Sequence, residues 1–394
     1  MMKKQNRYIT PEGTRDILFE EERIKDRVAG AFSELARSKG YRKIETPALE
    51  FYDVFEPFIA EEQMIKISDY KGRLMVLRPD VTQAVARVMA TRLKDEALPV
   101  RLFYQQDVFR GDVRTGQISQ SGIELIGVGG VKADIELIVT AATALEKCGL
   151  KGFCIEISDI GFFRGLMDAL DLEPQQKEDI RAAIESKNYA ALGDILDALD
   201  LPDCQKKALS ELPRLFGTDE VFEKAALIAY NDRAADALDY LKEIYARLQK
   251  LGYADIVSID LGLVNRGDYY TGLIVRGYIE GYGEAVLFGG RYDDLCGAFG
   301  RELAATGFAL YLDKIVKAEM GRAGKFAFDK PDGIIFYEDG YEKRAIFFAK
   351  ENARLGKCFE MSLFDNIEQT RQYCMDKGIG QIFVIGDEVT LIKL

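Results

Sequence analysis

RLFYQQDVFRGDVRTGQISQSGIELIG, residues 101–127, is the stretch that decides the fold of this chain. Residues 101–110 and 118–127 are both rich in aromatic and β-branched side chains, and the polar run GDVRTGQ with its two glycines separates them. Apolar runs of this type around a glycine-containing loop are typical of a β-hairpin. The sequence therefore predicts two paired strands joined by a long loop.

The second predicted strand carries two polar side chains on one face. Because side chains alternate along a strand, five residues share this face: Ile118, Gln120, Gly122, Glu124 and Ile126. The Cα atoms of Gln120 and Glu124 are then about 13 Å apart, and Gly122 leaves a hollow between them. Buried polar groups are costly unless something satisfies them. Two interpretations stay open: the floor of a ligand site, or a strand with one solvent-facing edge.

The composition is that of a soluble globular protein with two or three domains. The chain has 394 residues, of which 48% are hydrophobic, and no apolar run approaches the length of a membrane span. The N-terminus has no apolar core and no small-residue cleavage site, so we expect no secretory signal. The six cysteines are scattered without a CxxC pair, which is typical of reduced thiols in a cytoplasmic protein. The net charge of −12 disfavours nucleic acid as a ligand, although an acidic chain can carry a basic patch.

The chain contains no histidine. This absence excludes histidine as a general acid or base, as the activator of a nucleophile and as a metal ligand. Without a CxxC pair either, the sequence predicts no zinc site, and we expect no other metal and no cofactor. Two explanations of the missing histidine stay open: chance in the composition, and selection for a protein that must be synthesised when histidine is scarce.

The N-terminal third begins with a helix and a broken strand. Ile24, Val28, Phe32 and Leu35 recur at helical spacing and predict a helix over residues 20–39. A strand follows over residues 41–55, which Pro47 interrupts. Proline inside a strand favours an edge or a kink where another chain could pack, and an ordinary strand end explains it equally well.

A hairpin and a second helix come next along the chain. Residues 64–80 predict two strands with Lys71 and Gly72 at the turn, and residues 81–93 predict a helix. Asp80 lies directly before this helix. It is placed either to cap the first turn or to face a pocket and receive a cationic group, and both interpretations stay open.

The remaining elements follow a clear order. After the opening hairpin we expect a helix over 135–145, a strand within 148–163, a leucine-rich helical insertion at about 164–250, strands over 256–295 and a helix over 305–320. The segment 323–332 reads as a linker. Residues 333–394 predict a small βαβαβ-like unit with buried strands and a parallel sheet, of a size that favours packing on a neighbour. We therefore divide the chain into domains 1–325 and 326–394.

Several motifs along residues 8–320 resemble the class II aminoacyl-tRNA synthetase core, and within it the histidyl-tRNA synthetase family. They are TPEGTRDIL (10–18), ETPALE (45–50), LRPDVT (77–82), VFRGD (108–112), GGRYDDL (289–295) and TGFALYLDKI (306–315). The resemblance implies an α+β fold: an antiparallel sheet flanked by helices, with the helical insertion and a small C-terminal α/β domain. That last domain resembles a trimmed anticodon-binding domain.

The chain departs from the synthetase pattern where adenylation needs positive charge. Asn265 replaces the arginine expected before the tyrosine pair, and Arg266 is displaced by one residue. Lys314 replaces the arginine that closes the third motif, so bidentate phosphate binding is lost. Arg110 remains at the second motif, but Asp112 stands for glutamate and the following loop lacks the family's basic, aromatic run. The resemblance thus implies a site without adenylation chemistry.

The amino-acid pocket of the family is retained. Asp80, Thr82 and Gln120 match the positions that hold the ammonium and carboxylate end of histidine. Glu124 and Tyr270 match those that hold the imidazole, and Tyr292 matches a tyrosine that lines the site. Asp80 is one methylene shorter than the family's glutamate, so its contact with the ammonium group is weaker or passes through water.

A histidine pocket without adenylation machinery resembles the synthetase paralogues that serve as regulatory subunits of ATP phosphoribosyltransferase. This resemblance implies a non-catalytic chain that forms a homodimer through its core and a hetero-octamer with a short-form catalytic subunit. It also implies that L-histidine is bound as a feedback signal of its own biosynthesis, with neither tRNA nor membrane as a partner. The alternatives are a divergent histidyl-tRNA synthetase and a synthetase-like module for another amino acid or partner.

Overall fold

The computed structural model describes residues 5–111, 116–150, 152–264, 269–322 and 330–394. The chain divides into two compact units, Met1–Arg322 and Ala323–Leu394. The boundary expected between residues 325 and 326 lies outside the described residues, as do Asn265, Arg266 and Asp112.

A nine-stranded sheet forms the centre of the first unit in the described part of the chain. In spatial order its strands are β1 (Arg42–Lys43), β5 (Val100–Phe109), β6 (Gln117–Ile126), β12 (Ala305–Tyr311), β11 (Ala285–Arg291), β10 (Leu273–Ile279), β7 (Phe153–Asp159), β9 (Val257–Asp260) and β8 (Phe216–Gly217). The pairs from β5 through β7 are antiparallel, whereas β1 with β5 and β7 with β9 are parallel. The fold is therefore the predicted α+β class with a largely antiparallel sheet.

The hairpin predicted from residues 101–127 is confirmed as β5 and β6. Their register runs from Val100 opposite Ile126 to Phe109 opposite Gln117. Strand β6 also pairs with β12 on its other side, so it has no open edge. Residues 119–126 are all buried. The interpretation of β6 as a strand with one solvent-facing edge was therefore wrong, because the sheet continues beyond it and helices cover it.

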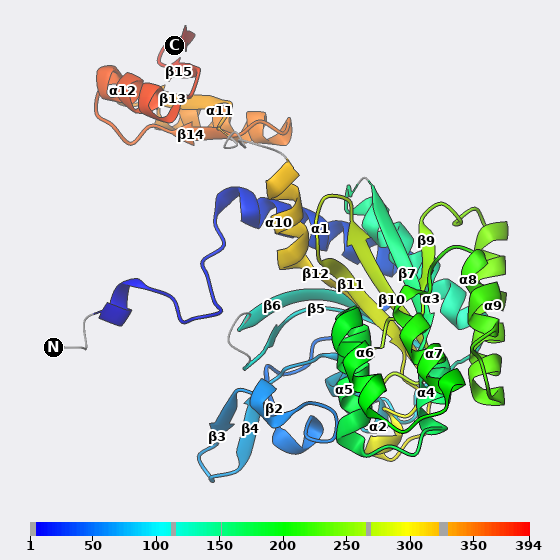
Figure 1. The fold of residues 1–394 in the computed structure, drawn as a ribbon. Helices are drawn as coiled ribbons and strands as arrows, with labels where there is room; N and C mark the ends of the chain where they lie inside the picture. Colours follow the sequence, from blue (N-terminus) through cyan, green and yellow to red (C-terminus); the bar gives the residue numbers. More distant parts are fainter. Residues whose placement is uncertain (1–4, 112–115, 151, 265–268, 323–329) are drawn as a thin grey trace. The chain divides into compact units, whose positions relative to one another are not determined.

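Helices cover one face of this sheet (Figure 1). Helix α1 (Phe19–Ser38) packs on α10 (Leu312–Arg322) and α3 (Val131–Lys147). Helix α10 contacts β6, and α3 contacts β12. The predicted apolar positions of α1 are buried, and Phe32 lies edge-on to Phe308 of β12 with ring centroids 6.1 Å apart. The helices expected over 20–39 and 135–145 are thus confirmed, with α3 longer than predicted.

The opposite face carries a short helix and a small sheet. Helix α2 (Thr82–Ala90) precedes β5 in the chain, and β2 (Leu49–Phe51), β4 (Leu74–Leu77) and β3 (Lys66–Ser68) form a three-stranded sheet. The hairpin over 64–80 is confirmed, and Gly72 takes the positive φ of +78° that its turn requires. Pro47 separates β1 from β2, which belong to different sheets, so the strand expected over 41–55 is divided at the proline.

The prediction of a helix over residues 305–320 was wrong for the first half of that segment. Residues 305–311 form β12, between β11 and β6, and the helix begins only at Leu312. Gly307 is a poor helix former, and both neighbouring strands need a hydrogen-bonding partner at this position. Sheet pairing therefore overrides the apolar pattern that the segment shares with a helix.

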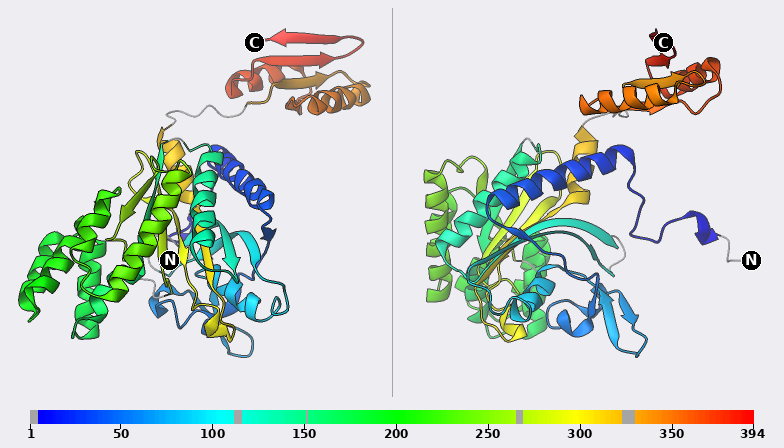
Figure 2. Two further views of the ribbon diagram at one scale, coloured as in Figure 1. Left: turned by 90° about the vertical axis from the view of Figure 1, so that its right-hand side faces the viewer. Right: turned by 180° about the vertical axis from the view of Figure 1, so that it is seen from behind.

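The leucine-rich region near 164–250 is helical, as predicted, and forms a lobe beside the sheet (Figure 2). Its helices are α4 (Ile160–Asp168), α5 (Pro174–Glu185), α6 (Tyr189–Ala198), α7 (Asp203–Glu211), α8 (Glu220–Ala226) and α9 (Asp232–Lys250). Residues 160–163, expected at the end of a strand, already belong to α4. Asp159 caps this helix by accepting a hydrogen bond from the backbone N–H of Gly161 at 2.8 Å.

The second unit is a four-stranded sheet with two helices in its described part. Its elements are β13 (Gly333–Tyr337), α11 (Glu342–Arg354), β14 (Phe359–Met361), α12 (Ile367–Lys377), β15 (Gln381–Ile385) and β16 (Val389–Lys393). Strand β13 pairs in parallel with β14 and β15, and β16 adds an antiparallel edge. The predicted parallel α/β unit is confirmed.

Candidate functional site

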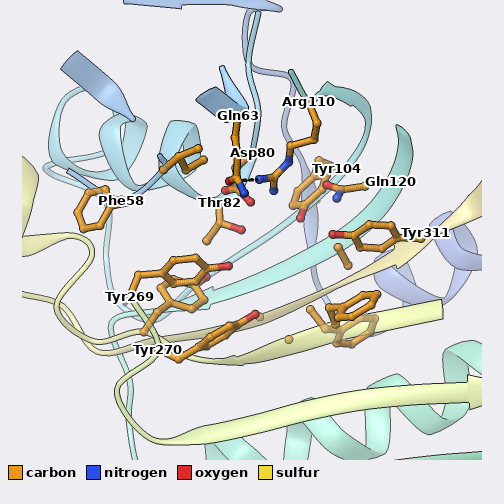
Figure 3. Close-up of a pocket in the computed structure, with 17 residues that line it drawn as sticks. Phe58, Gln63, Asp80, Thr82, Tyr104, Arg110, Gln120, Tyr269, Tyr270 and Tyr311 are labelled. Carbon is orange, nitrogen blue, oxygen red and sulfur yellow. Dashed lines mark hydrogen bonds between the residues drawn. The ribbon is translucent and has the colours of Figure 1, made fainter. Parts of the chain in front are cut away.

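A cavity of about 200 Å³ opens on the face of the sheet that bears α2. Its described lining is rich in tyrosine, and only Asp80 and Arg110 in it carry charge (Figure 3). The full lining is Phe58, Ile59, Gln63, Asp80, Thr82, Tyr104, Arg110, Gln120, Tyr269, Tyr270, Phe288, Gly289, Tyr292, Gly307, Phe308, Ala309 and Tyr311. Residues from distant parts of the chain therefore meet at the predicted site.

Glu124 lies at the floor of this site, behind two of its lining residues. The carboxylate accepts a hydrogen bond from Thr82 Oγ1 at 2.8 Å and another from the hydroxyl of Tyr292. Glu124 itself is only 1% exposed. Its cross-strand neighbour is Gly307 of β12, where a Cβ atom would overlap the Glu124 carboxylate. A glycine at 307 is thus what allows a glutamate side chain to lie flat across the sheet.

The environment of Glu124 favours its protonated form. Burial raises the pKa of Glu124 to about 8, the hydrogen bonds from Tyr292 and Thr82 partly oppose this rise, and the nearby Asp80 carboxylate adds to it. At neutral pH the pocket floor is therefore mostly an uncharged carboxyl group. A group of this kind can accept a hydrogen bond or give up its proton to a basic ligand.

Gly122 does not leave the hollow that the sequence pattern predicts. It lies opposite Tyr104 of β5, and a Cβ atom at 122 would overlap the ring and hydroxyl of Tyr104. The tyrosine fills the space between Gln120 and Glu124 and lines the cavity. The expectation of a hollow was wrong because a cross-strand side chain occupies the room that the glycine provides.

Asp80 both caps a helix and faces the cavity, whereas its contact with a cationic group of a ligand stays a prediction. Its Oδ1 accepts a hydrogen bond from the backbone N–H of Gln83 at 3.1 Å, so it caps the first turn of α2. It also lines the cavity. Burial raises the pKa of Asp80, and the positive charge of Arg110 opposes this rise. Arg110 in turn donates to Gln63 Oε1 at 3.5 Å.

Gln120 lies at the same end of the cavity as Asp80 and Arg110 (Figure 3). It is 3% exposed and stands opposite Tyr311 of β12 in the register of the sheet. Tyr311 was not among the residues predicted for the site. No residue pattern marked it, because the segment that contains it was expected to be helical.

Tyrosine rings close the other end of the cavity. The rings of Tyr269 and Tyr270 lie 4.6 Å apart between centroids, and the ring of Tyr292 meets Tyr269 edge-on at 6.2 Å. Tyr270 and Tyr292 are the residues that the sequence predicted, whereas Tyr269 was missed as a lining residue. The neighbouring pair in the sequence could have indicated it. The seven residues predicted for the site thus meet in one place, six as lining and Glu124 behind them.

Lys314 and Arg291, two further cations of the synthetase-like motifs, do not line this cavity. Lys314 forms an ion pair with Glu284 at 3.0 Å and lies over the rings of Phe288 and Tyr311. Arg291, from the GGRYDDL motif, is paired at 2.5 Å with the fully buried Asp134 of α3. Lys314 therefore holds a carboxylate and two rings, and Arg291 has a structural role.

The described residues contain neither a candidate metal site nor a candidate membrane span. No cluster of three or more acidic, cysteine or histidine side chains there is arranged to hold a metal ion. None of the described helices is long and apolar enough to cross a membrane.

Comparisons with known proteins identify the family of this chain. The family model for histidyl-tRNA synthetase matches residues 13–315. The ATP phosphoribosyltransferase regulatory subunit of Clostridium acetobutylicum is 39% identical to this chain. The alignment is 394 residues long and covers 97% of this chain and 96% of that protein.

Solved structures give the same result. A crystal structure from Bacillus halodurans, described as an ATP phosphoribosyltransferase regulatory subunit/histidyl-tRNA synthetase, is 30% identical with a TM-score of 0.83 and covers 93% of this chain and 96% of its own. A histidyl-tRNA synthetase from a Nostoc species shares the fold at 18% identity, with a TM-score of 0.81 and coverage of 98% and 97%. The chain therefore belongs to the family of ATP phosphoribosyltransferase regulatory subunits, within the wider family that the histidyl-tRNA synthetase model describes.

Proposed function

We propose that this chain binds L-histidine in the cavity beneath α2 and regulates a separate ATP phosphoribosyltransferase catalytic subunit, without performing chemistry itself. The observation that carries the proposal is the meeting of Asp80, Thr82 and Gln120 with Tyr270 and Tyr292 around one small cavity, over the carboxyl group of Glu124. Family membership supports the regulatory role, and the residues that line the cavity support L-histidine as the ligand.

The polarity of the cavity suits a zwitterionic amino acid with a basic ring. At one end, Asp80 and Arg110 provide one negative and one positive charge, which match an ammonium and a carboxylate group. In our assignment Asp80, Thr82 and Gln120 hold this end of the ligand. Glu124 and Tyr270 hold the imidazole, because a carboxyl group buried among tyrosines can accept the imidazole N–H or protonate the ring.

The catalytic role falls to a partner. We propose that the chain forms a homodimer through its synthetase-like core and joins a short-form catalytic subunit in a hetero-octamer, which needs both chains for activity. The Clostridium acetobutylicum relative supports the existence of a catalytic partner, since it is a protein named as a regulatory subunit. All six cysteines are unpaired, and this supports a reducing, cytoplasmic location.

Feedback requires that histidine bind one state of the assembly more tightly than another. We propose that the rim of the cavity makes this distinction, either through residues 111–117 or through the segment after Tyr270. Gly111 borders the backbone of residues 62–64, next to the lining residue Gln63, so a change at this rim reaches the pocket directly. Residues 112–115 of the first candidate lie outside the described part of the chain.

Calorimetry on the purified chain tests the pocket. L-Histidine should bind, and Glu124→Ala should weaken binding by about 10- to 100-fold, the range for a lost hydrogen bond to a charged group, which Glu124 and the imidazole form once the proton passes to the ring. Glu136→Gln is a matched control, because Glu136 pairs with Arg101 away from the cavity. Its affinity should equal that of the wild type. Absence of histidine binding in the wild type would refute the pocket assignment.

Co-expression with a short-form catalytic chain tests the role. Phosphoribosyltransferase activity should require both chains, and histidine should suppress it in the wild-type assembly more strongly than in the assembly with Glu124→Ala. Histidine-dependent exchange between ATP and pyrophosphate by the isolated chain would instead identify a divergent histidyl-tRNA synthetase. A thermal-shift screen in which another amino acid stabilises the chain better than histidine would identify a different binding module.

A further inference from the structure

Tyr311 stands between two cavities. A second cavity, of about 550 Å³, is lined by residues of the N-terminal segment, the start of β6 and the start of α10. Among the described residues, Tyr311 is the one that lines both this cavity and the pocket proposed for histidine. Its side chain is therefore the wall between them.

Contacts on several sides hold the Tyr311 ring in place. Its centroid lies 4.8 Å from that of Phe288, and Lys314 Nζ lies 5.5 Å from it on the side of the second cavity. On the side of the first cavity Tyr311 is the cross-strand partner of Gln120, and Figure 3 shows these two side chains directed toward each other. Moving the ring would break its contact with the Phe288 ring and its cation–π contact with Lys314 together.

The wall stands at the end of the pocket that receives the backbone part of an amino acid. Asp80, Arg110 and Gln120 gather there, whereas Tyr269 and Tyr270 close the opposite end. A ligand seated with its ammonium and carboxylate at the charged end has Tyr311 beyond its carboxylate. A free carboxylate ends before the ring, and a group attached to that carboxylate would need the space that the ring fills.

We propose that Tyr311 is a specificity-determining residue that admits free amino acids and excludes derivatives extended at the carboxyl group. This inference rests on the proposed function, since it takes the orientation of histidine from it. The class of ligand excluded is any amide, ester or mixed anhydride of the amino acid with a bulky leaving part. The ring thus confines the site to the free metabolite.

The test compares two amides that lack the carboxylate charge equally. L-Histidinamide carries no added bulk, and L-histidine β-naphthylamide carries an aromatic group where the ring of Tyr311 stands. Displacement of bound L-histidine gives the affinity of each, and their ratio isolates the effect of bulk. In the wild type the naphthylamide should bind at least about 10-fold more weakly than histidinamide, because insertion against a packed ring is strongly unfavourable. In Tyr311→Ala the ratio should fall to within about 3-fold.

Two further variants make the outcome specific. Tyr311→Phe keeps the ring and loses the hydroxyl, so it should preserve the wild-type ratio. Tyr311→Leu opens the wall less and replaces the alanine variant if that one does not fold. Equal binding of the two amides by the wild type would overturn the inference, and so would an unchanged ratio in the opened variants or loss of exclusion in Tyr311→Phe. Failure of the wild type to bind L-histidine at all would instead refute the proposed function.

Discussion

The buried carboxyl group of Glu124 should make the stability of the chain depend on pH. Burial raises its pKa from 4.5 to about 8 in the folded state. Between these values the folded chain holds a proton at Glu124 that the unfolded chain has lost. Since stability falls with pH wherever the folded state binds more protons, Glu124 should destabilise the fold progressively as pH rises from about 4.5 to about 8.

The magnitude follows from the same two values. At about 1.4 kcal/mol per pKa unit, their difference corresponds to a total of about 5 kcal/mol. Between about pH 5.5 and about pH 8.5 the expected loss is about 3 kcal/mol, since part of the change lies below this window. The side chain is 1% exposed, so solvent screening reduces the effect little.

Glu124→Gln isolates this effect, because an amide of the same shape does not titrate. Urea unfolding at about pH 5.5 and about pH 8.5 gives the free energy of unfolding of each protein. The variant should gain about 3 kcal/mol relative to the wild type as pH rises across this window. Other buried acids with raised pKa values, such as Asp159 at about 6, are present in both proteins and cancel in the difference.

The decisive quantity is how the difference in free energy of unfolding between Glu124→Gln and the wild type changes with pH. A constant offset between wild type and variant would report only the changed hydrogen bonds to Thr82 and Tyr292. Glu136→Gln should follow the wild type at both pH values, since it alters a carboxylate outside the pocket. A difference for Glu124→Gln that stays flat from about pH 5.5 to about pH 8.5 would refute the assignment of a protonated Glu124.

Two other predictions follow from contacts at or near the site. Gly122→Ala should destabilise the chain by about 1–3 kcal/mol and weaken histidine binding, because the added Cβ would displace the Tyr104 ring. Gly193→Ala is the control, since a Cβ there meets open space, and it should change neither quantity. Urea unfolding measures the stability, and calorimetry measures the binding. Arg291→Met should lower the free energy of unfolding by about 3–5 kcal/mol, because it leaves Asp134 buried without its cationic partner. The added change Asp134→Leu should restore most of this stability. Equal free energies of unfolding for the single and double variants would contradict the prediction.

The residue pattern predicted the hairpin because the pattern is local. Aromatic and β-branched runs on either side of a glycine-containing loop are sufficient to define β5 and β6. The same pattern placed Gln120 and Glu124 on one face. It could not place Tyr104 over Gly122, because whether a glycine leaves a hollow depends on the cross-strand neighbour, and the register was not yet known.

The error at residues 305–320 has a similar cause and a larger consequence. An apolar segment of this length fits a helix and a buried strand alike. Only the pairing of β12 with β6 and β11 decides between them. The helical prediction hid Tyr311, whose position on a strand directs its side chain to the cavity. The motif resemblance pointed to residues that do line the cavity, whereas Tyr311 could be found only from the assembled sheet.

The distribution of positive charge explains how one fold can recognise an amino acid without activating it. Stabilising a reacting phosphate requires cations that converge on it and are not already neutralised. Here Lys314 is paired with Glu284, Arg291 with Asp134, and only Arg110 among the described cations lines the first cavity. Arg110 faces the single negative charge of Asp80 there, so the pair matches a zwitterion, and the described lining has no further cation for a phosphate. The pairing of Arg110 with Asp80 that supports our proposal of histidine as the ligand thus also argues against ATP in the same cavity.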